Sequence, residues 1–449
     1  MRRLARRALL LLALAPAGRA AAQDFGDRRC IMSVERMERY RRVEGPGGDL
    51  TFYAGGGVEL SCLGTTVRMR SDSLYAVNNF RTTYFIGHVH YSDSTMETTA
   101  DRGTYYKDGE RWEGRGNVVS RNLRTGSTLR GPSLDYQRPV PGQRDTAEMY
   151  AVGRPRIDYV PTDSAGQAQE AYVIFGDRVR FRGNDRVYAG GRVTIDRSDF
   201  AARGDSLRLD TGAGQDGALV GNAHMEGKGA DAFTLDGRRI LLRLAGNELS
   251  GVRAVVGAHA VNGEWDLTAD SIDLAVAHRQ LVQTLAWGDS TRPHGVSAAR
   301  EIRADSLAID TPERTPTEIR AFGRGWVATG TDSAGLRDWL EGDTVVAHFA
   351  PADSGPARSV LRQVDARGRA RSFYRVTDRQ RPGAPSLSYV RGDHIAVFFR
   401  PAGDNGVERV EVRGQVDGVQ LEPRPAPADS LRADSLRVRA DSARQGRIP

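Results

Sequence analysis

Two short sequence patterns alternate along this chain of 449 residues, and their alternation limits what the chain can fold into more than any other feature. The first is a glycine followed closely by a β-branched or small apolar residue. It occurs at Gly57-Val58, Gly87-His88-Val89, Gly116-Asn117-Val118, Gly191-Arg192-Val193, Gly221-Asn222-Ala223, Gly257-Ala258, Gly325-Trp326-Val327 and Gly414-Gln415-Val416. The second is usually an Asp, preceded by a small or polar residue and followed by alternating apolar residues. It occurs at Asp72, Asp101, Asp205, Asp270, Asp305, Asp343 and Asp393. The two patterns lie about 13 to 15 residues apart and the full unit recurs roughly every 30 to 38 residues, which predicts two strands and two turns per unit.

Apolar and polar residues alternate inside each unit. Val193 and Ile195 are two positions apart, as are Leu207 and Leu209, so each pair shares one face of a strand. Polar or small residues occupy the other face, which is typical of antiparallel sheets with one face in water. We therefore predict an all-β, repeat-built antiparallel protein of about 20 strands stacked in series, each contacting mainly its neighbours.

Three segments depart from the repeats. Residues 1–22 combine N-terminal arginines, a short apolar run and an Ala-x-Ala site before Gln23, which predicts a cleaved secretory signal peptide. The apolar run is far shorter than the ~20 residues that span a bilayer. Residues 137–170 contain several prolines and indicate an insertion or a joint between subdomains. Residues 422–449 repeat Ala-Asp-Ser-Leu-Arg and form a low-complexity tail, which leaves 23–421 for the repeats.

The charge and the cysteines bound the function classes further. The chain carries +7, but residues 1–22 hold five arginines and no acid, which leaves 59 basic against 57 acidic residues, or +2. This balance argues against bulk nucleic-acid binding. Cys30 and Cys62 are the only cysteines. In an oxidising compartment they can form one disulfide, although the sequence does not supply the Cα separation that this bond requires.

No pattern in the chain indicates catalysis or metal binding. His88 and His90 share a strand face, but Asp93 falls on the other face, so we interpret the histidines as a surface pair. The recurring aspartates are expected to cap turns by accepting hydrogen bonds from local backbone amides, and the glycines to occupy positive-φ or close-approach positions. The sequence contains no nucleophile elbow, zinc-protease motif or phosphate loop. We expect no enzyme activity, no cofactor and no metal site.

The two alternating patterns, as in Ala100 to Tyr105 and Gly116-Asn117-Val118, resemble those of the OstA-like family over roughly residues 50–420. This family contains the periplasmic bridge protein of lipopolysaccharide transport and the N-terminal domain of the outer-membrane translocon. The resemblance implies an open β-jellyroll, an elongated solenoid-like stack whose V-shaped interior holds acyl chains. The chain is longer than a single bridge protein, yet too short for that domain plus a full outer-membrane barrel. Its step in the pathway is therefore left open.

The apolar residues of the repeats are the candidates for a lipid-binding groove. An apolar sheet face must be covered by a second sheet or by a ligand, and each buried methylene contributes about 0.8 kcal/mol. The candidates are Val58, Val89, Val118, Val193, Ile195, Leu207, Leu209, Ile272, Leu274, Leu307 and Ile309. A plain sheet core without a ligand is the alternative interpretation for each of them.

The expected function is binding of lipopolysaccharide or a related acylated glycolipid in the periplasm, either free there or associated with the outer membrane. Such a protein would be peripheral to membranes and would pair with other jellyroll transport proteins through unpaired edge strands, not with nucleic acid. The alternative is a structural or adhesive cell-surface β-solenoid that binds polysaccharide. The absence of a closing membrane strand and of aromatic girdles disfavours an outer-membrane barrel.

Overall fold

The structure is a computed structural model. It describes residues 30–229, 232–263, 265–298, 300–312, 315–329, 337–351, 359–376, 385–400 and 407–422. The expected signal peptide, and the expected tail beyond Glu422, lie outside the described residues.

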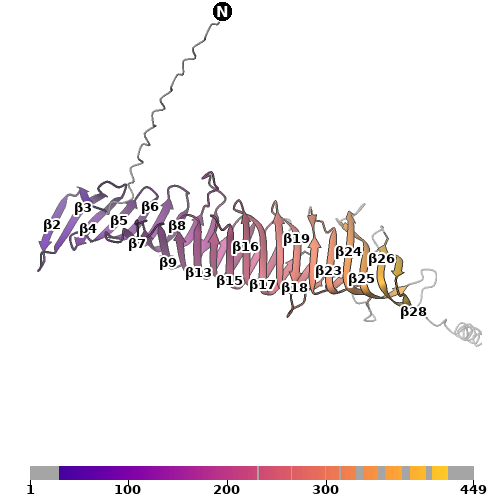
Figure 1. Ribbon diagram of the computed structural model, residues 1–449. Helices are drawn as coiled ribbons and strands as arrows, with labels where there is room; N and C mark the ends of the chain where they lie inside the picture. Colours follow the sequence, from indigo (N-terminus) through magenta and orange to yellow (C-terminus); the bar gives the residue numbers. More distant parts are fainter. Residues whose placement is uncertain are drawn as a thin grey trace, which may run out of the picture. The chain divides into compact units, whose positions relative to one another are not determined.

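The chain divides into two compact units, and the boundary after Gly153 falls inside the proline-containing region 137–170. The N-terminal unit contains β1 (Met32–Arg36), β2 (Arg39–Glu44), β3 (Leu50–Cys62), β4 (Arg68–Val77), β5 (Thr82–Ser92), β6 (Met96–Tyr106), β7 (Arg111–Asn122), β8 (Thr128–Gln137) and β9 (Glu148–Val152) (Figure 1). The C-terminal unit contains β10 (Arg156–Tyr159), β11 (Tyr172–Phe175), β12 (Arg178–Arg182), β13 (Arg186–Asp196), β14 (Phe200–Asp210), β15 (Asp216–Gly227), β16 (Phe233–Ala245), β17 (Glu248–Asn262), β18 (Trp265–Ala277), β19 (Gln280–Trp287), β20 (His294–Val296), β21 (Arg300–Arg303), β22 (Ser306–Asp310), β23 (Glu318–Thr329), β24 (Trp339–Pro351), β25 (Ser359–Val376), β26 (Ser386–Phe399), β27 (Val407–Arg413) and β28 (Asp417–Leu421).

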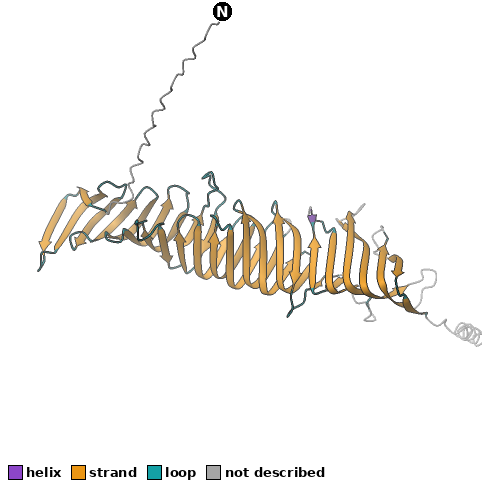
Figure 2. Cartoon of the chain, viewed as in Figure 1, coloured by secondary structure: helices purple, strands orange, loops and turns teal. Residues whose placement is uncertain are grey.

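Strands dominate both units (Figure 2), and no described residue belongs to an α-helix. The β5 sequence shows why, because its threonines, valine, isoleucine and aromatic residues favour a pleated strand. Successive strands pair antiparallel, as β5 does with β6 and β13 with β14. The predicted all-β, antiparallel class is confirmed. The described residues form 28 strands rather than about 20, and several of them, such as β20 and β21, are short.

Most long strands are divided once by a corner, where the pairing register shifts. In β5 the shift lies between Ile86 and Val89, and in β13 between Gly190 and Val193. Segments on one side of the corners pair with one another and not with segments on the other side. The set of paired segments that contains Val89 and Val193 is called the A segments. The set that contains Ile86 and Gly190 is called the B segments.

The inner faces of the A and B segments meet and form the core of each unit. In the N-terminal unit the ring of Tyr91, on an A segment, stacks on Trp112, on a B segment, with 4.9 Å between ring centroids. Both side chains are at most 1% exposed. In the C-terminal unit Tyr159 on an A segment lies 5.9 Å from Phe181 on a B segment. The chain therefore covers the predicted apolar face with its own second set of segments.

Candidate functional site: the apolar interior and its border

Most corners set a glycine against a carboxylate from the preceding strand or turn, whereas a Cβ on Gly257 would have no atom within 4 Å. Gly116 and Asn117 have φ angles of 76° and 45°, a left-handed conformation that suits glycine and asparagine. A Cβ on Gly116 would lie 2.4 Å from Oδ2 of Asp101 in β6, and Asn117 donates a hydrogen bond of 2.9 Å to the same oxygen. The same close approach pairs Gly87 with Asp72, Gly191 with Asp177, Gly221 with Asp205, Gly323 with Asp305, Gly368 with Asp343 and Gly414 with Asp393.

The prediction that the recurring aspartates cap local turns by binding backbone amides is wrong for several of them. They lie at the corners and bind the side chain that follows the glycine of the next strand. Nδ1 of His88 is 2.8 Å from Asp72, and this hydrogen bond raises the pKa of His88. Nη2 of Arg324 is 2.7 Å from Oδ1 of Asp305 in the same way. The aspartates therefore join neighbouring strands instead of closing turns.

Two repeats differ in detail. Asp270 accepts hydrogen bonds from the backbone amides of Ser290 and Thr291, at 2.8 and 2.9 Å, in the loop between β19 and β20. Gly325 does not have a positive φ, because the left-handed pair of that repeat begins two residues earlier, at Gly323. A Cβ on Gly325 would lie 2.9 Å from the carbonyl oxygen of residue 321, so this glycine is a close-approach position.

Two rows of uncharged, mainly apolar residues run along the inner face of the B segments in the C-terminal unit, and successive members are register partners on neighbouring strands. The first row is Ala189, Leu207, Leu219, Ile240, Ala254, Ile272, Ala286, Leu307, Ala321, Val345, Ala366, Ile395 and Val412. The second row is Val187, Leu209, Gly217, Leu242, Val252, Leu274, Thr284, Ile309, Ile319, Ala347, Val364, Val397 and Val410. Neither row contains a charged side chain.

The structure places the candidate groove residues in the interior between the A and B segments. Leu207, Ile272 and Leu307 belong to the first row and Leu209, Leu274 and Ile309 to the second, while Val193 and Ile195 lie on the A segment of β13. Val58, Val89 and Val118 follow the corners of the N-terminal unit. All except the half-buried Ile309 are at most 3% exposed. An acyl chain can therefore reach them only where A and B segments separate.

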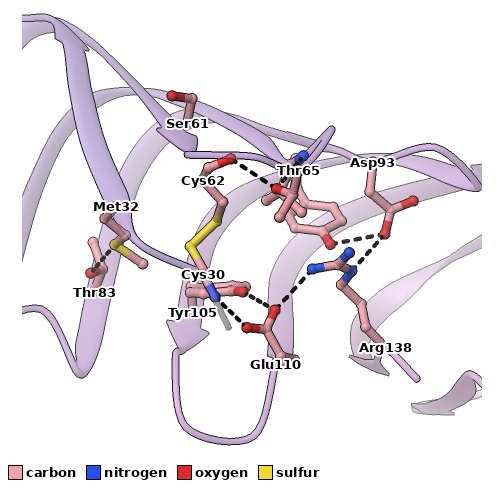
Figure 3. Close-up of a disulfide and its surroundings, with 12 residues drawn as sticks. Cys30, Met32, Ser61, Cys62, Thr65, Thr83, Asp93, Tyr105, Glu110 and Arg138 are labelled. Carbon is pink, nitrogen blue, oxygen red and sulfur yellow. Dashed lines mark hydrogen bonds and ion pairs between the residues drawn. A yellow bond between two sulfur atoms is a disulfide. The ribbon is translucent and has the colours of Figure 1, made fainter. Parts of the chain in front are cut away.

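A buried ionic cluster joins the ends of the A and B segments in the N-terminal unit. Asp93 follows the A segment of β5, and Glu110 precedes the B segment of β7. Arg138 lies between them: its Nη1 donates to Oε2 of Glu110 at 2.8 Å, and its Nε is 3.5 Å from Oδ2 of Asp93 (Figure 3). The side chains of Asp93 and Glu110 are 3% and 6% exposed, and that of Arg138 is 21% exposed. One arginine thus connects both sets of segments at the border of the interior.

Three buried tyrosines add hydrogen bonds to this cluster. The hydroxyls of Tyr91 and Tyr136 donate to Oδ2 of Asp93 at 3.0 and 3.3 Å, and that of Tyr105 donates to Oε2 of Glu110 at 2.6 Å. Burial, and then the neighbouring carboxylates, raise the pKa of all three phenols. The phenols therefore remain neutral donors at physiological pH.

The cysteines complete the same border. Cys30 and Cys62 form a disulfide, which the sequence left open, with a Cα separation of 4.9 Å. The two residues are 0% and 1% exposed. Cys62 ends the A segment of β3, while the backbone N–H of Cys30 donates to Oε1 of Glu110, next to a B segment, at 2.7 Å (Figure 3). The disulfide and this hydrogen bond form a second connection across the border.

The C-terminal unit has a border cluster of its own. Arg197 follows the A segment of β13, and its side chain is 3% exposed. Its Nη1 donates to the hydroxyl of Tyr172 at 2.7 Å and to the backbone oxygen of Asn247, in a turn between B segments. Arg279, in another turn between B segments, donates to Glu170 at 3.2 Å. The buried Arg197 and the exposed Arg279 therefore bridge A and B ends in this unit, as the half-buried Arg138 does in the N-terminal unit.

Strands β2 and β28 each leave one backbone edge exposed. β2 pairs only with β3, and all six of its residues are exposed. Strand β28 pairs only with β26, and its Val419 and Leu421 are 58% and 59% exposed. Within the described residues these strands can accept a further strand.

Sequence reasoning missed the border clusters. Asp93 stands out in the sequence only as an acid near His88 and His90, and Arg138 is 28 residues from Glu110 along the chain. One signal was available: Tyr91 and Tyr105 are large polar-tipped residues at apolar-face positions, and a buried tyrosine hydroxyl requires a partner. The identity of that partner depends on which turns meet in space.

The described ranges contain no group of three or more His, Cys, Asp and Glu side chains placed to hold a metal ion. In the same part of the chain, no helix is long and apolar enough to cross a membrane. The chain matches no protein-family model and no curated protein.

Proposed function

We propose that this protein is a non-catalytic periplasmic lipid-binding protein of lipopolysaccharide transport and outer-membrane assembly. In this proposal the A and B segments form an open β-jellyroll that holds acyl chains between them. The observation that carries the proposal is the pair of uncharged inner rows, which continue in register from β13 to β27. The resemblance of the repeats to the OstA-like family and the expected signal peptide point to the same pathway and compartment.

The energetics allow an acyl chain to compete with the closed interior. A chain that buries about 12 methylenes gains about 10 kcal/mol of transfer free energy. That gain offsets the cost of separating the packed A and B segments, since the ligand replaces one apolar surface by another. The small residues of the first row, such as Ala254, Ala286 and Ala321, leave the least side-chain volume to displace.

The exposed edges supply the binding surfaces for partners in this proposal. An edge strand offers unpaired N–H and C=O groups, to which a strand of another jellyroll protein can add. β2 and β28 provide such edges. Directional transfer requires an external energy source, which a partner would have to supply.

The tight burial of the inner rows also supports a second function, that of a structural or adhesive scaffold with a dry core. In that case the interior has no ligand and the outer faces bind polysaccharide or other envelope components. The two functions differ in which face a lipid touches.

Photo-crosslinking from neighbouring positions on one strand tests this difference. Leu207 is an inner residue and Arg208, its neighbour in β14, is exposed on the outer face. A photoreactive phenylalanine analogue is placed at either position, and each variant is irradiated with acylated lipopolysaccharide or with a deacylated control. We expect an adduct only from position 207, and only with the acylated form. Adducts only at position 208, or equal adducts with both forms, would favour the scaffold and refute acyl binding.

A further inference from the structure

We propose that Arg138, Asp93, Glu110 and the disulfide-tethered Cys30 form a latch that holds the interior of the N-terminal unit closed. Hydrogen bonds and an ion pair cross or reinforce this border, and all of them converge on the two carboxylates (Figure 3). The latch determines how often A and B segments of this unit separate. Where it controls access of a lipid, the inference rests on the proposed function.

Glu110 is the centre of the latch because three donors meet on it. Oε1 accepts the N–H of Cys30 at 2.7 Å, and Oε2 accepts Tyr105 at 2.6 Å and Arg138 at 2.8 Å. Cys30 reaches it through a bond to Cys62 on an A segment, whereas Tyr105 belongs to a B segment. Separation of the two sets of segments must therefore break hydrogen bonds to this carboxylate.

The charge of Arg138 gives the cluster two stable arrangements, one closed and one open. Two buried carboxylates share one arginine, so its removal from either one leaves an unpaired charge in a poorly solvated place. Burial lowers the pKa of Arg138, but Tyr91, Tyr105 and the two acids outweigh this and raise it, so the guanidinium stays charged. With a side chain 21% exposed, Arg138 can swing to water as the border opens. The closed and open arrangements are then distinct states.

The position of the latch separates it from an ordinary core contact. Tyr91 donates a hydrogen bond to Asp93 and stacks on Trp112, so the latch adjoins the contact between A and B inner faces. Glu110 and Asp93 stand in turns, between strands, where local opening costs least. The latch therefore covers the point at which the interior can first be entered.

The disulfide provides the assay, because both cysteines are at most 1% exposed and dithiothreitol can attack only when the border opens. The reduction rate of the Cys30–Cys62 bond, followed by maleimide–polyethylene glycol gel shift, measures this opening. Loss of a charge-assisted hydrogen bond lowers the free energy of opening the border. Arg138→Gln and Glu110→Gln should therefore each speed reduction about tenfold or more. Arg138→Lys, which keeps the charge, should fall between the wild type and Arg138→Gln.

Arg115→Gln is the matched control, since Arg115 is an exposed arginine of the same unit with one long ion pair of 3.7 Å. Hydrogen exchange of β6 and β7 in the reduced and oxidised wild type gives a second measurement that does not depend on substitution. Faster exchange after reduction is expected. Equal reduction rates in the wild type, Arg138→Gln and Glu110→Gln, or unchanged exchange after reduction, would overturn the latch.

Lipid access is measured separately with cis-parinaric acid as the acyl probe. Faster binding of the probe to Arg138→Gln than to Arg115→Gln would show that the latch limits entry. If the reduction rates change as expected and the probe binds neither protein, the latch stands and the proposed acyl binding fails. If the probe binds both at equal rates while reduction is unaffected, the latch fails and acyl binding stands.

Discussion

Replacement of Gly116 by alanine should destabilise the N-terminal unit through two separable effects. The φ of 76° costs an L-residue about 1 kcal/mol. The new Cβ would also lie 2.4 Å from Oδ2 of Asp101 and displace it from Asn117, which removes a hydrogen bond worth about 1 kcal/mol or more. The total loss in the free energy of unfolding should be about 2 to 4 kcal/mol.

Gly126 offers a matched control for the first effect. Its φ is 80° and no atom lies within 4 Å of a Cβ placed on it, so Gly126→Ala should cost only about 1 kcal/mol. Both residues lie in or just after β7, and hydrogen exchange of β6 and β7 reports the local free energy of opening for each variant. That local measurement is preferable to a global melt, because stacked repeats need not unfold in one step.

The second effect is isolated by removing the carboxylate. In the double variant Gly116→Ala/Asp101→Gly the added Cβ has room. The loss in the free energy of opening, measured relative to Asp101→Gly alone, should therefore be no larger than the loss caused by Gly126→Ala. Equal losses for Gly116→Ala and Gly126→Ala, or no relief in the double variant, would refute the packing of glycine against aspartate at the corners.

Two further predictions concern packing and charge. Gly103→Val should strongly destabilise the N-terminal unit in urea unfolding, because a Cβ there would lie 2.0 Å from Cη2 of Trp112; an unchanged midpoint would contradict the close packing. Burial raises the pKa of Asp273, but hydrogen bonds from Arg243 and Arg253 outweigh this and lower it. Its stabilisation is therefore present above the unfolded pKa and is lost as pH falls through the folded one. Asp273→Asn should lose less stability than the wild type between about pH 5 and pH 2, measured by thermal unfolding, and parallel losses would exclude this role.

In our proposals the latch of the N-terminal unit and the inner rows of the C-terminal unit both bear on how the interior opens. The rows contain only uncharged side chains, so separation of A and B segments exposes no buried charge there. Arg138 and Arg197 lie at the border, where they bridge the segment ends. In these proposals a few polar interactions control opening. The apolar surface contributes favourable transfer free energy when a ligand or the opposite segment covers it.

The sequence by itself determined the strands and the face that each buries. Alternation with a period of two is a local property, so Leu207 and Leu209 were assigned to one inner face without knowledge of any partner. The repeated glycines likewise indicated special backbone positions, because only glycine adopts a left-handed φ without cost. The exported class and the acyl-binding role remain predictions that rest on the resemblance and the signal segment.

Only the tertiary structure decided what covers the inner face and which polar groups meet at its border. A corner of two residues folds most long strands so that A and B segments face each other, and several aspartates then serve neighbouring strands instead of their own turns. Asp93, Glu110 and Arg138 are far apart in sequence, and their contact depends on where three turns lie in space. Periodicity specifies which side of a strand is apolar. The partner of a buried charge depends on contacts between residues distant in sequence, which no local pattern encodes.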